Sequence, residues 1–239
     1  MIEKLLMKLA ARDEVSAEEE AALREVVGEP VDVRSDRTVI RVGQELNEST
    51  LLLEGLMCRY KDLADGGRQI SELNVAGDFV DLHSFTLKRL AHNIMTLTPC
   101  RIAPAPHEKL KRITEQFPHL TRLLWFSTNL DAAIHREWML SLGRRSAVER
   151  TAHLFCELFI RFEIVGMTEG NRYRLPITQT DLAECLGLTA VHVNRTLKVL
   201  REEGLVEFRR RTVIIHDMDG LKRVAEFSPT YLSLEKRPR

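Results

Sequence analysis

Residues 177–201 read Ile-Thr-Gln-Thr-Asp-Leu-Ala-Glu-Cys-Leu-Gly-Leu-Thr-Ala-Val-His-Val-Asn-Arg-Thr-Leu-Lys-Val-Leu-Arg and contain two helical patterns separated by a short turn. In both patterns the apolar residues recur at three- to four-residue steps, which places them on one face of a helix. We therefore expect two packed helices in this segment. The inward-facing residues are Leu182, Leu186, Val193, Leu197 and Leu200.

The turn between these helices has the residue types that a helix-turn-helix requires. Gly187 can adopt a positive φ without a steric penalty, and Thr189 is placed to cap the second helix. Ala183 is small where the two helices approach each other, and Leu188 fills their junction. These residue types at these offsets predict a helix-turn-helix. An ordinary corner between two helices would show a similar pattern and remains the alternative.

The segment after the second helix predicts a β-hairpin, or wing, with a basic turn. Residues 204–216 read Gly-Leu-Val-Glu-Phe-Arg-Arg-Arg-Thr-Val-Ile-Ile-His. Residues 172–211 hold eight basic and five acidic residues, a net charge of +3, whereas the whole chain balances 35 basic against 35 acidic residues. Arginines beside a DNA-reading helix would contact backbone phosphates. A solvated surface turn is the alternative reading.

The first half of the chain predicts a β-roll preceded by helices. A capping pattern at Ser16-Ala-Glu-Glu19 starts a helix within residues 1–29. From Val31 to about Pro106, β-rich runs alternate with glycine-containing turns, which is typical of an antiparallel roll or barrel. The Asp65-Gly-Gly67 turn predicts a hairpin between residues 58–60 and 69–73.

Helical periodicity returns after Pro106, and a helix of roughly 24 residues, about 36 Å at 1.5 Å per residue, is expected from Leu120 to a stop at Gly143. An apolar stripe of this length needs a partner, so we expect the helix to form a homodimer seam. The alternative is that it packs against its own β-roll. A further helix is expected from Ala147 to Val165. The residues predicted for the dimer interface are Leu123, Leu130, Ile134 and Trp138.

Several classes of protein are disfavoured by the composition. The four cysteines are scattered without a CxxC or Cys/His cluster, so we expect buried thiols, no metal site and a reducing cytoplasm. No apolar run approaches the length of a membrane span or of a signal-peptide core. No phosphate-binding, nucleophile-elbow or zinc-protease motif is present, so we expect neither an enzyme nor a cofactor.

Together these features resemble the Crp/Fnr superfamily of bacterial transcriptional regulators. The segments that carry the resemblance are Gly43, Leu51–Gly55, Asp65–Arg68, Gly77–Phe79 and Thr178–Arg201. The resemblance implies an α+β fold in three parts. Residues 1–118 would form N-terminal helices and a cyclic-nucleotide-binding-like jelly roll, 119–145 a dimerisation helix, and 146–239 a winged helix-turn-helix.

The resemblance also implies a homodimer that binds palindromic double-stranded DNA, with RNA polymerase as a candidate partner and an unidentified effector. The second motif helix would enter the major groove. Family members carry Glu-x-x-Ser-Arg on this face, where this chain has Val191, Asn194 and Arg195. The alternative is an effector- or protein-binding module that no longer contacts DNA. The predicted DNA-binding residues are Thr178, Thr180, Thr189, Ala190, Val191, His192, Asn194, Arg195, Lys198, Arg209, Arg210 and Arg211.

Two departures from the family pattern predict that cyclic AMP is not the effector. The Arg-Ser pair that holds the cyclic phosphate falls on Leu90-Ala91, with Arg89 one residue away. The residues that face the adenine in family members fall on His135 and Arg136. The oxygen-sensing branch uses an N-terminal cysteine cluster, and residues 1–40 contain no cysteine. Heme binding through His83 or His92 remains an alternative.

Overall fold

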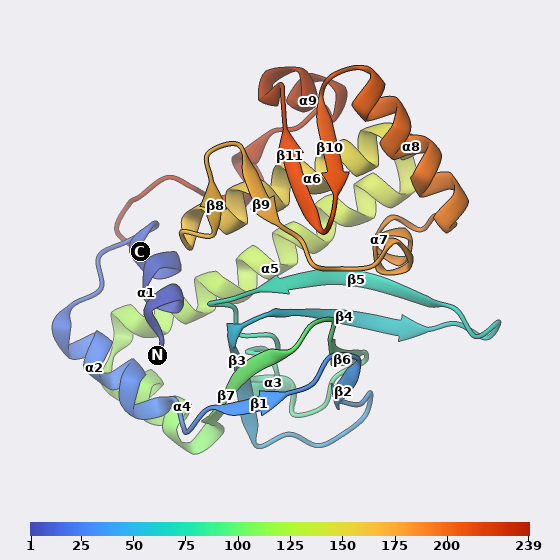
Figure 1. The fold of residues 1–239 in the computed structure, drawn as a ribbon. Coiled ribbons are helices and arrows are strands. Elements are labelled where there is room, and N and C mark those ends of the chain that lie inside the picture. Colours follow the sequence, from blue (N-terminus) through green and yellow to red (C-terminus); the bar gives the residue numbers. More distant parts are fainter.

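The computed structural model describes residues 1–239 and has three parts (Figure 1). A β-roll lies below, a second α/β unit lies above it, and the long helix α5 (Pro118–Arg144) runs between them. The N- and C-termini lie close together, and the Arg237 amide donates to the Arg12 carbonyl at 3.0 Å. This is the predicted α+β fold.

The roll consists of two antiparallel sheets with strand orders β1-β7-β3 and β2-β6-β4-β5. The predicted hairpin is confirmed: Asp65-Gly-Gly67 joins β4 to β5, with Asp62 paired to Arg68. A core of apolar side chains, including Leu52, Met57 and Ile94, lies within the roll. The strands are β1 (Val31–Val33), β2 (Arg37–Ile40), β3 (Glu48–Glu54), β4 (Leu56–Asp62), β5 (Arg68–Val75), β6 (Asn93–Thr96) and β7 (Cys100–Pro106).

Helices cover the ends of the roll and lead into the second unit. Helix α2 begins at the predicted capping box, where the Ser16 hydroxyl accepts from the Glu19 amide and the Glu19 carboxylate accepts from the Ser16 amide. An equivalent box, formed by Ser146 and Glu149, starts α6 directly after α5. The helices up to this point are α1 (Glu3–Ala10), α2 (Ala17–Val26), α3 (Ser84–Leu87), α4 (His107–Gln116), α5 and α6 (Ala147–Ile164).

The C-terminal unit packs a helix pair and a small sheet around α6. Its sheet has the strand order β10-β11-β9-β8. No helix in the structure combines the length and the apolar character that a membrane crossing needs. The elements are β8 (Thr168–Glu169), β9 (Arg172–Arg174), α7 (Gln179–Leu186), α8 (Ala190–Glu202), β10 (Val206–Arg209), β11 (Thr212–Ile215), α9 (Met218–Val224) and the 3-10 helix η1 (Pro229–Leu232).

The apolar stripe of α5 that we predicted to form a dimer seam packs against other parts of the same chain. Leu123 is fully buried with α1 and the roll, and Ile134 and Trp138 are buried in the core shared with α6. Leu130 is half-buried against that core. Leu123, Ile134 and Trp138 thus make their contacts with β-roll and helix side chains of the same chain, and the role of these four residues in a dimer interface stays a prediction.

All four cysteines are buried and unpaired, as expected: Cys58, Cys100, Cys156 and Cys185. Burial raises the pKa of the Cys156 thiol to about 12, which keeps it protonated and unreactive at neutral pH.

Candidate nucleic-acid interface

The helix-turn-helix forms at the predicted residues. The Thr178 hydroxyl accepts from the Asp181 amide at the start of α7, and the Thr189 hydroxyl accepts from the His192 amide at the start of α8. Gly187 ends α7 with φ +59°, where an added Cβ would lie 3.2 Å from Leu142 Cδ2. Both the positive φ and the close approach favour glycine at this position.

The two helices of the motif bury the expected face and leave the other free. Leu182, Leu186, Val193 and Leu200 are buried, and Leu197 is half-buried. Full burial of such side chains contributes about 1.5–3 kcal/mol each. The motif is therefore a packed unit of the C-terminal core rather than a loose surface corner.

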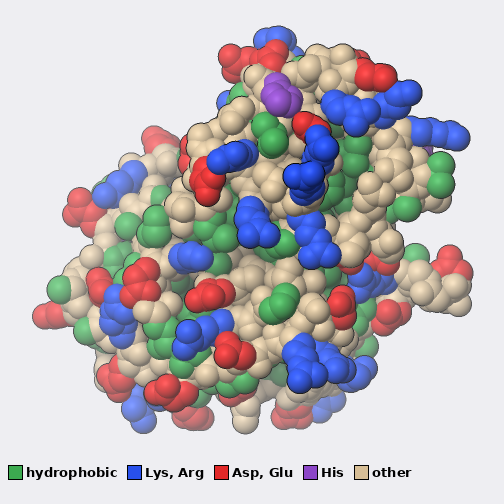
Figure 2. All heavy atoms as spheres, viewed as in Figure 1, with side chains coloured by type: hydrophobic (Ala, Val, Ile, Leu, Met, Phe, Trp, Pro, Cys, Tyr) green, Lys and Arg blue, Asp and Glu red, His purple; other side chains and the backbone are tan.

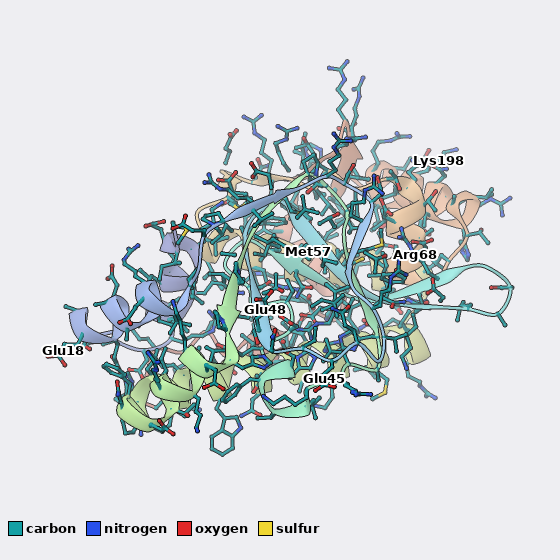
Figure 3. All side chains as sticks on the ribbon, turned by 90° about the horizontal axis from the view of Figure 1, so that it is seen from below. Glu18, Glu45, Glu48, Met57, Arg68 and Lys198 are labelled. Carbon is teal, nitrogen blue, oxygen red and sulfur yellow. The ribbon has the colours of Figure 1, made fainter.

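The predicted reading residues lie on the free face. Ala190 is half-buried at the start of α8, and Arg195 makes no ion pair or side-chain hydrogen bond within the chain. Lys198 contacts only Glu202, at 3.6 Å, and extends from α8 at the edge of the molecule (Figure 3). The exposed members of the predicted set on these helices are Thr178, Thr180, Thr189, Val191, His192, Asn194, Arg195 and Lys198.

The wing ends in a two-residue turn with an unusual backbone. Arg209 pairs with Thr212, so Arg210 and Arg211 alone connect β10 to β11. Their φ angles are +50° and +60°, the left-handed conformation that a type I′ turn needs and that Asn-Gly usually supplies. Strained residues of this kind concentrate at functional sites. Arg209, Arg210 and Arg211 are all exposed.

Replacing the turn residues should separate stability from DNA affinity. In the variant Arg210→Asn/Arg211→Gly, relief of the left-handed strain is expected to raise the free energy of unfolding by about 1–2 kcal/mol. Loss of phosphate contacts should weaken DNA binding and flatten its salt dependence. Urea unfolding and binding at several salt concentrations measure both effects. Arg210→Lys/Arg211→Lys is the control that keeps charge, and an unchanged salt slope in the first variant would contradict the wing contact.

Ion pairs between the roll and the C-terminal unit were not predicted from the sequence. Arg68 on β5 contacts Asp181 at 2.7 Å and also pairs with Glu184, both on α7. Arg161 on α6 donates to the Leu73 carbonyl at 2.6 Å and to Asp78 at 3.2 Å. These contacts fix the first motif helix and α6 to the sheet that contains β5.

A second unpredicted network fills the roll beneath α5. Arg59 lies fully inside the protein and donates to Glu72 at 2.7 Å, Asp131 at 2.8 Å and the Val80 carbonyl at 2.8 Å. His135 Nε2 lies 3.3 Å from the same Glu72 carboxylate. Every polar nitrogen of the Arg59 guanidinium thus has a partner from this chain.

Comparison with known proteins agrees with this architecture. A family model of the Crp-like helix-turn-helix domain matches residues 149–224. A probable transcriptional activator of Rhizobium leguminosarum bv. viciae is 34% identical over 192 residues, covering 78% of this chain and 77% of that protein. The nitrogen fixation regulation protein FixK of Bradyrhizobium diazoefficiens is 32% identical over 194 residues, covering 78% of each.

A solved structure shows the same fold. FixK2 from Bradyrhizobium japonicum matches with a TM-score of 0.76 and 22% identity, covering 85% of this chain and 99% of that one. The match of this chain to the Crp-like helix-turn-helix model and its identity to the two named regulators lead to the same conclusion. The chain belongs to the Crp/Fnr family and is a DNA-binding transcriptional regulator with a Crp-type helix-turn-helix at α7–α8.

Proposed function

We propose that this regulator is a cytoplasmic homodimer that binds palindromic promoter DNA through α8 without needing cyclic AMP. The observation that carries the proposal is the free face of α8, on which Arg195 has no partner within the chain. Residues 1–118 would act as the sensor unit, 119–145 as the dimerisation helix and 146–239 as the DNA-binding unit. A relative named as a probable activator favours activation, with RNA polymerase as the protein partner.

The dimer is supported by apolar side chains that α5 leaves exposed. Trp125 is 67% exposed, Met139 69% and Leu140 47%. Trp125, Ala132 and Met139 are spaced seven residues apart, so they share one face of the helix. The same face of a second copy would cover them. Two-fold symmetry would then place the two α8 helices about 34 Å apart, one turn of duplex, on half-sites about ten base pairs apart.

Arg195 is proposed to read a guanine through its O6 and N7 atoms. Val191 replaces the acidic residue of the family pattern and can pack against a thymine methyl, so the half-site should differ at that base pair. Arg195→Ala is expected to cost about 1–3 kcal/mol of binding free energy and to relax the preference at one position. Random-site selection with wild type and variant measures this. An unchanged consensus would mean that Arg195 contacts only the backbone.

Independence from cyclic AMP is supported by the residues at the positions where family members hold the nucleotide. Leu90 is a buried apolar residue, and Arg89 is exposed and paired with Glu45 at 2.8 Å. His135 falls at a position that faces the adenine in family members, and its Nε2 atom lies 3.3 Å from the Glu72 carboxylate of the Arg59 network. Isothermal titration calorimetry is expected to detect no binding of cyclic AMP, and the nucleotide should not change DNA affinity. Binding at low micromolar concentration would refute this part of the proposal.

A further inference from the structure

The segment after α9 leaves the C-terminal unit and crosses to the N-terminal helices. Residues 226–239 pass through η1 and end beside α1, on the left side of Figure 1. The first part of the segment is anchored in the core, because Leu232 is buried and the Tyr231 hydroxyl donates to Glu157 of α6 at 2.8 Å. Residues 234–238 are exposed and have no regular structure. The segment therefore combines a packed anchor with an exposed end that lies on another part of the chain.

The exposed end is held by hydrogen bonds to the loop that follows α1. The Arg237 amide donates to the Arg12 carbonyl at 3.0 Å, and the Arg239 amide donates to the Asp13 carboxylate at 2.7 Å. The Arg12 guanidinium, which is itself buried, donates to the Leu232 carbonyl at 3.2 Å. The loop after α1 thus binds the segment at its anchor and at its end.

Helix α5 holds the same end from the other side. The guanidinium carbon of Arg239 lies 3.8 Å from the centre of the Phe126 ring, a cation–π contact. The Arg122 Nε atom donates to the Arg239 backbone oxygen at 2.7 Å. Lys236 and Glu14 form a longer, exposed ion pair at 3.9 Å, and pairs of this kind contribute little. The attachment therefore depends chiefly on Arg239.

The other polar contacts between the C-terminal unit and the roll follow a single strand. Arg68 at the start of β5 pairs with Asp181 of α7, and Arg161 of α6 donates to the Leu73 carbonyl near the end of β5. Contacts along one line leave rotation about that line unrestrained. The 226–239 segment attaches the unit to α5 and to the loop after α1, away from this strand (Figure 1). It supplies the restraint on rotation that the contacts along β5 lack.

We propose that residues 226–239 are a strap that fixes the orientation of the C-terminal unit and thereby sets the half-site spacing that a dimer accepts. Exposed residues without regular structure open at a lower free energy than the core, so the strap is released by local unfolding. It acts without touching DNA. In Figure 2 the basic side chains gather over the wing strands and α8, whereas both signs of charge lie at the upper left edge, where the strap runs. The proposal rests on the proposed homodimer.

Half-site spacing reports the orientation of the two units directly. One additional base pair moves the second half-site by about 3.4 Å and turns it by about 35°. A dimer with fixed units cannot engage both half-sites after this change and loses the gain from simultaneous binding. A dimer with loosened units adapts to either spacing and keeps part of that gain.

The test compares wild type with Lys236→Glu/Arg239→Glu on three kinds of DNA: the selected palindrome, palindromes with one base pair added or removed at the centre, and a single half-site. Wild type is expected to bind the respaced palindromes about 10²-fold more weakly than the selected one. In the variant the new carboxylates face Glu14 and Asp13, so the strap should detach and this preference should fall to about threefold. Half-site affinity should be unchanged, because α8 is untouched.

Hydrogen exchange at the amide of position 237 reports strap docking without DNA. This amide is bonded to Arg12 in wild type and should exchange slowly, whereas in the variant it should exchange as in an unfolded peptide. The matched control is Arg41→Glu/Arg237→Glu, which reverses the same charge. Arg41 is exposed on the roll, and the Arg237 guanidinium contacts only Glu235, at 3.6 Å. The control should behave as wild type in both measurements.

The outcomes separate the strap from the proposed function. Free exchange of the Arg237 amide in wild type would overturn the strap, and so would a released variant that keeps the wild-type spacing preference or binds the half-site more weakly. If the two glutamates leave the amide protected, deletion of residues 234–239 replaces them, since it keeps the buried Leu232 and carries the same expectations for DNA. Wild type that binds the palindrome no better than the half-site would instead refute the proposed homodimer.

Discussion

Replacement of Met139 and Leu140 by glutamate is expected to produce a monomer that binds the palindrome about 10²–10⁴-fold more weakly than wild type. In a dimer, binding of one half-site holds the second recognition helix near the other at high effective concentration, and a monomer loses this gain. Met139 is 69% and Leu140 47% exposed, and neither belongs to a core cluster of the chain, so the substitutions leave its own core untouched. Inside a seam, however, the paired glutamates would be buried without a counter-charge.

Sedimentation equilibrium and titration of full-site and half-site duplexes measure the two effects. The variant should bind an isolated half-site as wild type does, since α8 is unchanged. The matched control is Ile134→Asp, on the buried face of the same helix, which should lower the free energy of unfolding by several kcal/mol because it buries an unpaired charge. A Met139→Glu/Leu140→Glu variant that remains dimeric at micromolar concentration would show that another surface forms the dimer.

The parts of the fold that could be predicted are those encoded within a few neighbouring residues. Gly187 in the turn, the hydroxyl caps at Thr178 and Thr189, and the alternation of residues 204–216 are local signals, and each appears at the expected residue. The exposure of Arg195 follows from helix periodicity once Val193 is known to point inward. The candidate site was therefore largely predictable, because it lies on one short continuous segment.

What could not be predicted depends on contacts between distant segments. The apolar stripe on α5 indicates that Ile134 and Trp138 pack against other apolar side chains. It does not indicate whether those side chains belong to the same chain or to a second copy. The pairing of Arg68 with Asp181 joins residues 113 positions apart, and nothing near either residue indicates the other. The contact of the strap with the loop after α1 likewise joins Arg239 to Asp13, which lie 226 positions apart in the sequence.

Arg59→Met is expected to destabilise the protein by about 3–5 kcal/mol at pH 8, because it leaves the buried Glu72 carboxylate without its principal counter-charge. Methionine fills much of the same volume, so the effect reports charge more than a cavity. The matched control is Arg59→Met/Glu72→Gln, in which both charges are removed. Asp131 is partly exposed and can remain hydrated in both variants, so the control should recover most of the lost stability.

The loss of folding stability in the Arg59→Met variant should become smaller as the pH falls. Burial raises the pKa of Glu72, and removal of the nearby guanidinium raises it further. A carboxyl group whose pKa is higher in the folded state than in the unfolded state favours folding below the unfolded value of about 4.3, and this contribution disappears as the pH rises through the folded value. Urea unfolding of wild type and both variants at pH 5 and pH 8 measures the difference. The double variant lacks the titrating Glu72 carboxyl group, so its stability deficit relative to wild type should change less with pH than the deficit of Arg59→Met. Equal losses of stability for Arg59→Met at the two pH values would show that the buried Glu72 charge is not the cause.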